Sequence, residues 1–167
     1  VEIVSSFKKL ADRLHAFNPN LNVILTLSPV RHIKDTLELN SVSKAVLRSS
    51  IHELVSSIDN VHYFPAYELM LDDLRDYRFY KSDMLHPSEE AEEYIWQKFI
   101  DCYFDTPAQE FTERWREIST SLAHKPFHPK SEGHQKFLRS LLQKLNELKG
   151  SINVDSEIGY VKQQLNP

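Results

Sequence analysis

The residues best suited to chemistry in this sequence are Asp83 and His86, which lie three positions apart and just before Pro87. On a tight turn, that spacing lets the carboxylate reach the near ring nitrogen of the imidazole. The pairing fixes the tautomer of the ring and leaves its far nitrogen able to take a proton from a hydroxyl nucleophile. An alternative is a helix-entry loop whose Asp and His are solvated or capping. The spacing therefore indicates a candidate general base, His86, with Asp83 as its orienting acid.

A second group of polar residues follows an apolar run at residues 23–27, which has the length of a buried strand. We predict that Arg31 or His32 lines a substrate pocket, where it could bind a carboxylate or a sugar hydroxyl. The alternative is a strand-ending turn with Arg31 in a surface ion pair. Ser28 is disfavoured as a nucleophile because nothing around it resembles a Gly-x-Ser-x-Gly elbow.

Residues 67–80 mix acidic, basic and aromatic side chains. The favoured interpretation is a solvated helix or loop whose charges pair locally, each pair contributing roughly 0–1 kcal/mol. The alternative is a lid or pocket wall that brings Arg75 and Arg78 beside His86. In that case Arg78 would be a substrate-binding residue.

Three histidines, His124, His128 and His134, have spacings that resemble those of a metal site. A pair four residues apart chelates a metal only on a helix, and Pro126 between the first two argues against a helix there. We therefore predict no metal site, and nothing else in the sequence indicates a cofactor.

The remaining pattern predicts helices that alternate with two strands. Apolar residues recur at helical spacing over residues 3–17 and 42–58, the second helix with Asn40 or Ser41 as its cap. Strands are predicted at residues 23–27 and 61–64, and a strong amphipathic helix follows at residues 88–104. This order predicts an α/β layer of parallel strands flanked by helices.

Beyond residue 105 the pattern becomes purely helical. We expect residues 1–105 to form the α/β domain and residues 106–167 to form a helical C-terminal extension. Helices are predicted around residues 111–122 and 137–148, the second ending at Gly150, and the last residues are expected to be loosely held. Cys102, on the apolar face of its helix, is expected to be a small core residue.

Composition excludes several classes of partner. The formal charge of −4 gives no electrostatic case for binding nucleic acid or an anionic membrane. No apolar run approaches the roughly 18 residues that a membrane span needs. A single cysteine rules out an intrachain disulfide. No secretory leader is visible, which favours a cytoplasmic location over a secreted one, although a leader before Val1 would not be seen.

The motif at residues 83–88 resembles the last block of the SGNH (GDSL-like) esterases. Together with residues 28–32 and 74–80, it resembles the GSCFA-domain family, an SGNH-like group of bacterial proteins. The resemblance covers roughly residues 1–105 and extends into the tail. It implies a partial SGNH-like three-layer α/β fold and a serine esterase that acts on an acylated carbohydrate or small molecule.

The family's nucleophilic serine lies in a Gly-Ser-Cys-Phe-Ala segment, which this sequence does not contain. We therefore expect the chain to correspond to the C-terminal half of the catalytic domain and to be inactive alone. The competing hypothesis is a ligand-binding or assembly module without enzymatic activity. Two parallel strands alone would leave sheet edges exposed, which predicts that the chain could form homo-oligomers.

Overall fold

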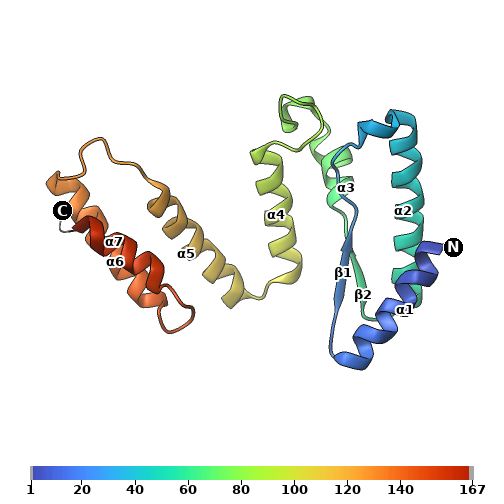
Figure 1. Ribbon diagram of the computed structural model, residues 1–167, viewed down its shortest axis with the longest axis horizontal. Coiled ribbons are helices and arrows are strands. Elements are labelled where there is room, and N and C mark those ends of the chain that lie inside the picture. Colours follow the sequence, from blue (N-terminus) through green and yellow to red (C-terminus); the bar gives the residue numbers. More distant parts are fainter. Residues whose placement is uncertain (1, 166–167) are drawn as a thin grey trace. The chain divides into compact units, whose positions relative to one another are not determined.

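A computed structural model describes residues 2–165, apart from the side chain of residue 35, and shows a mixed α/β fold (Figure 1). The chain divides into two compact units, one ending at Tyr103 and the other beginning at Phe104. The first unit contains both strands of the described residues, and the second is entirely helical.

Two short parallel strands form the sheet of the first unit. Strand β1 (Val23–Thr26) pairs with β2 (Val61–Phe64), with Val23 opposite Val61 and Thr26 opposite Phe64. Both strands were predicted from their apolar runs and are confirmed within one residue. The described residues therefore show an α/β arrangement with a two-stranded sheet, but not a complete three-layer fold.

Helices lie on both sides of these strands (Figure 1). The predicted helices at residues 3–17 and 88–104 are confirmed as α1 (Glu2–Phe17) and α4 (Glu89–Tyr103). Helix α2 (Leu37–Ser57) connects the strands and contacts both α1 and β2. On the opposite side, Phe99 of α4 meets Phe64 edge to face, with ring centroids 5.1 Å apart.

Helix α2 begins earlier than predicted. The Thr36 side chain, rather than Asn40 or Ser41, caps it by accepting a hydrogen bond from the Leu39 amide at 3.3 Å. The Asn40 side chain accepts instead from the His32 amide, at 2.9 Å. The predicted cap was wrong because the Asn40 side chain bonds the backbone of the preceding loop. Asn40 itself lies inside the first turn of α2.

The charged segment after β2 is neither one regular helix nor an open loop. It contains α3 (Ala66–Glu68), the π-helical turn η2 (Leu69–Leu74) and the 3₁₀ turn η3 (Tyr77–Phe79). Met70 and Tyr80 are buried and pack in a small core with Ala91 of α4. The Asp83–His86 turn thus follows a segment that is anchored in the core.

The second unit is a three-helix cluster of α5 (Thr106–Ala123), α6 (Glu132–Leu148) and α7 (Asp155–Leu165). Asp105 and Ser131 cap α5 and α6 by accepting amide hydrogen bonds from Ala108 and His134. The expectation that the last residues are loosely held was wrong as far as residue 165, where α7 ends. Ile158 and Val161 of α7 are buried in the core of this unit.

Cys102 corrects another expectation, because its side chain is exposed and not in the core. The helical periodicity placed it on the apolar face of α4, but the buried residues of this helix are Ala91 and Ile100. None of the described helices is both long enough and apolar enough to span a membrane.

Replacing Leu145 with Ala tests the core of the helical unit. The Leu145 side chain is fully buried, at 0% exposure, so we expect the substitution to lower the free energy of unfolding by about 2–5 kcal/mol. Urea denaturation followed by circular dichroism measures this loss. Leu10→Ala, at a side chain 47% exposed, is the matched control and should cost less than about 1 kcal/mol. Equal losses for the two variants would contradict the assigned core.

Candidate active site

Asp83 and His86 form the pair predicted from their spacing. The Nδ1 atom of His86 lies 2.7 Å from Oδ2 of Asp83. Among residues 2–165 the imidazole makes this hydrogen bond through Nδ1, and Nε2 stays available to a further group. The His86 side chain is 53% exposed and that of Asp83 is 44% exposed, so a substrate or another segment could reach both.

Backbone hydrogen bonds build the turn that carries this pair. Oδ1 of Asp83 accepts from the amides of Leu85, at 2.8 Å, and of His86, at 3.0 Å. Met84, which follows Asp83, adopts a left-handed conformation with φ of 60°, which is uncommon for a residue other than glycine. The Lys81 amide also donates to the His86 carbonyl at 2.8 Å, which closes the turn.

The same bonds set the charge of Asp83. Hydrogen bonds from the His86 and Leu85 amides, and then from the His86 ring, lower the pKa of Asp83 from 3.8 to about 2. Hydrogen bonds that reach only the ionised carboxylate favour that form. Near neutral pH Asp83 is therefore an anion. It accepts a hydrogen bond from Nδ1–H of His86, so Nε2 is the nitrogen without a proton.

Arg31 reaches this turn from the loop after β1. Its backbone amide donates to the Leu85 carbonyl at 3.3 Å, and its Nη1 donates to the Met84 carbonyl at 3.1 Å. The guanidinium also lies over the ring of Tyr80, 4.2 Å from the centroid. The structure therefore brings Arg31 together with Asp83 and His86.

The recorded contacts of the other two predicted substrate-binding residues are local. The His32 amide bonds Asn40, and the exposed imidazole precedes the 3₁₀ turn η1 (Ile33–Asp35). The Arg78 guanidinium lies over Phe79, 4.8 Å from the centroid, while its amide donates to Asp76. No recorded contact joins either side chain to His86 within residues 2–165, and their roles in binding stay predictions.

Lys44 is a buried charged residue near the site that sequence reasoning missed. Its side chain is in the core, 6% exposed, and Nζ donates to the Ser28 carbonyl at 2.6 Å. Burial lowers the pKa of Lys44, because the charged form loses solvation. The bond ties α2 to the loop that carries Arg31. A lysine within a helix gives no local signal of such a partner.

A second missed group supports the carboxyl end of β2. Glu68 accepts from Arg48 Nε at 2.7 Å and from the Tyr63 hydroxyl at 2.6 Å. Burial and the Glu68 hydrogen bond raise the pKa of Tyr63, so it stays a neutral donor. These residues come from three elements, and only the fold brings them together.

An apolar pocket of about 420 Å³ lies beside the turn. Its wall includes Pro87, the residue directly after His86, and its polar members are Thr26 and Glu92. Part of this surface is open, since Ile24 is 37% and Trp96 is 42% exposed. The other lining residues are Ile24, Pro29, Phe64, Ala66, Ile95, Trp96 and Phe99.

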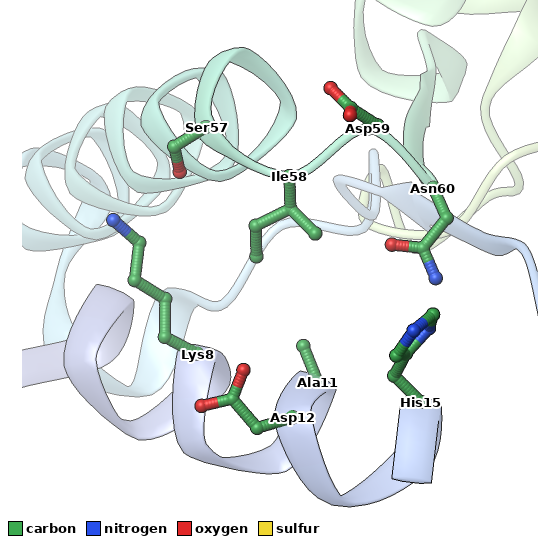
Figure 2. A pocket seen from close by; sticks show the side chains of 8 residues that line it. All are labelled: Lys8, Ala11, Asp12, His15, Ser57, Ile58, Asp59 and Asn60. Carbon is green, nitrogen blue, oxygen red and sulfur yellow. The ribbon is translucent and has the colours of Figure 1, made fainter. Parts of the chain in front are cut away.

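A larger pocket, of about 540 Å³, is at the opposite ends of the strands (Figure 2). Figure 2 shows Ile58 pointing into the space between α1, which contributes Asp12 and His15, and the segment before β2. Ligands of open α/β sheets bind outside the carboxyl ends of the strands. This pocket is at the amino ends, because Asn60 immediately precedes β2, so we assign it no catalytic role.

The histidines of the helical unit do not form a recognisable metal centre. The rings of His124 and His134 are 6.4 Å apart between centroids, and both contact Phe137. Among the described residues, no group of three or more His, Cys, Asp or Glu side chains is arranged to hold a metal ion.

Comparison with known families gives two matches. The model of the GSCFA family matches residues 1–99, and the model described as the GSCFA domain protein, C-terminal domain, matches residues 115–167. Searches of the curated proteins and of the solved structures found no match.

The charge of Asp83 can be measured directly. We expect its carboxyl carbon, followed by ¹³C NMR in the 167-residue chain, to titrate at about 2, against 3.8 for the ordinary group. Because the pKa is lower in the folded chain, the bonds of Asp83 stabilise the turn above about pH 4. That contribution is lost as the pH falls through about 2.

His86→Ala is the informative variant for this titration, because the two amide hydrogen bonds remain. We expect it to raise the pKa of Asp83 only part of the way towards 3.8, since the backbone bonds are the larger cause. The same titration in denaturant provides the unfolded reference. A native pKa equal to that reference would contradict the turn geometry.

Proposed function

Because the chain belongs to the GSCFA family, we propose that Asp83 and His86 are the orienting acid and the general base of an SGNH-type ester hydrolase. The observation that carries the proposal is the 2.7 Å contact from Asp83 Oδ2 to His86 Nδ1 on a hydrogen-bonded turn, with no hydrogen bond to Nε2 among residues 2–165. In this proposal the two parallel strands and their flanking helices belong to an SGNH-like three-layer fold.

The reaction follows the usual course of a serine esterase. As a seryl hydroxyl attacks the ester carbonyl, His86 Nε2 takes its proton, and Asp83 stabilises the imidazolium that forms. The imidazolium then gives the proton to the departing alcohol, leaving an acyl-enzyme. Water attacks this intermediate with the same base, which releases the carboxylic acid and restores the serine.

The nucleophilic serine hydroxyl is not among the groups that contact His86 in residues 2–165. Within residues 2–165 no serine hydroxyl is recorded as a partner of Nε2. In the family that the sequence resembles, the Gly-Ser-Cys-Phe-Ala motif provides it. We therefore propose that the complete natural protein, rather than the 167-residue chain alone, carries the activity.

The apolar pocket supports an acyl ester as the substrate class. Pro87 links its wall to His86, and a volume of about 420 Å³ suits an acyl chain. The alcohol part would then face the loop after β1, where the His32 side chain is exposed. An acylated carbohydrate or an acylated small molecule fits both halves of this description.

A binding or assembly module is the second candidate. The exposed apolar side chains Ile24 and Trp96 favour it, because surfaces of this kind often contact a ligand or a partner. In that case the Asp83–His86 turn would bind a ligand without transferring a proton. The following experiment separates the two candidates.

Hydrolysis of p-nitrophenyl acetate by the complete natural protein tests the enzymatic proposal. We expect His86→Ala to lower kcat/KM by about 10²–10⁴-fold, because general base catalysis is lost. His15→Ala, on α1, is the matched control and should retain the wild-type rate. The 167-residue chain alone should be inactive. Activity that survives His86→Ala, or no activity in the complete protein, would favour the binding module.

The acyl pocket predicts a dependence on chain length. Trp96→Ala should lower kcat/KM for octanoyl esters by about tenfold or more, since apolar contact with the longer chain is lost. Acetyl esters should be affected much less. Trp115→Ala, in the helical unit, provides a control for the loss of a tryptophan. Equal effects of Trp96→Ala on both esters would show that the acyl chain binds elsewhere.

A further inference from the structure

The backbone polar groups of the Asp83–His86 turn form hydrogen bonds with two partners, Asp83 and Arg31. Asp83 Oδ1 binds the amides of Leu85 and His86. The carbonyls of Met84 and Leu85 point to Arg31, one to Nη1 at 3.1 Å and the other to its backbone amide at 3.3 Å. One partner thus belongs to the pair itself, and the other comes from more than fifty residues earlier in the chain.

We propose that Arg31 is a positioning residue, which holds the turn in the conformation that places Asp83 against His86. Arg31 acts on backbone atoms of Met84 and Leu85, so its effect on the base passes through the turn. The inference rests on the proposed function for its catalytic meaning. Its main test measures the turn itself and does not require activity.

The turn needs such support because burial does not provide it. The side chains of Asp83 and His86 are both about half exposed, and Met84 is in the left-handed region that residues other than glycine rarely occupy. A strained and exposed turn persists only when surrounding bonds determine it. Two hydrogen bonds from Arg31, to the carbonyls of Met84 itself and of Leu85 after it, stabilise this conformation.

Arg31 is itself held by contacts with neighbouring elements. Its guanidinium lies over the ring of Tyr80, which is 9% exposed and forms a bridge with Pro87. Its loop is tied to α2 through the bond from Lys44 to the Ser28 carbonyl. A planar guanidinium can stack on the ring and donate to a carbonyl at the same time, which the ammonium of a lysine does less well.

The pKa of Asp83 reports the state of this turn in the 167-residue chain. We expect Arg31→Gln to loosen the turn, so that the amides of Leu85 and His86 leave Asp83. Its pKa, followed by ¹³C NMR, should then move from about 2 most of the way to 3.8. Arg31→Lys, which keeps one donor, should give an intermediate value.

Lys81→Gln is the charge-matched control. It removes one positive charge two residues before Asp83, but the Lys81 side chain pairs with Glu92 and not with the turn. We expect this variant to leave the pKa of Asp83 at its wild-type value. An equal rise in Lys81→Gln and Arg31→Gln would show a general charge effect and overturn the proposal. So would an unchanged pKa of Asp83 in Arg31→Gln.

Amide chemical shifts of β1 and β2 distinguish loosening of the turn from unfolding. If Arg31→Gln unfolds the chain, the test passes to Arg31→Lys, in which an unchanged pKa of Asp83 in a folded chain overturns the proposal. Kinetics in the complete natural protein add a second readout. A positioning residue should lower kcat with KM nearly unchanged, whereas a rise in KM alone would assign Arg31 to substrate binding and overturn the proposal.

The outcomes separate this inference from the proposed function. If the complete protein hydrolyses no ester, the proposed function fails, while a raised pKa of Asp83 in Arg31→Gln still supports the role of Arg31 in the turn. If esters are hydrolysed and Arg31→Gln changes neither the pKa of Asp83 nor kcat, the proposed function survives and the role of Arg31 is overturned.

Discussion

The parallel pairing of β1 with β2 is the constraint on which the candidate site depends. Its register places Thr26 beside Phe64, so both strands end at the same level and their following loops emerge side by side. One loop carries Arg31, and the other leads through the core residue Tyr80 to the Asp83–His86 turn. A shift of one residue would reverse the two faces of the shifted strand and displace its loop relative to the other. The site is therefore a consequence of strand register.

The electrostatics of the pair come from local hydrogen bonds and not from burial. The low pKa of Asp83 has the amides of His86 and Leu85 as its main causes, although the carboxylate is well exposed. Such a carboxylate is charged whether or not the site is covered. It can orient His86 before any substrate binds, so the turn is preorganised. The electrostatic gain of a dry active site would require a further group that excludes water.

Local features of the sequence predicted the components of the site but not their connections. The Asp83–His86 contact follows from a spacing of three residues, and both strands follow from short apolar runs. The bonds from Arg31 to residues 84–85 span more than fifty positions, and only the fold brings such groups together. Helix α7 was missed because a short helix with few apolar positions gains its stability from packing, and that packing buries Val161.

The exposed apolar pocket and the hydrogen-bonded turn have a common explanation in the proposed chemistry. Ile24 and Thr26 lie on the same face of β1, and Thr26 is paired with Phe64 of β2. Helix α4 reaches this face through the contact of Phe99 with Phe64. An acyl chain in this pocket would exclude water from the Pro87 side, next to His86. Substrate binding would thus provide the desolvation that the exposed pair lacks. A bound acyl chain would then strengthen the attraction between the Asp83 carboxylate and the imidazolium of His86, because the two charges interact in a less polar environment once the pocket is filled.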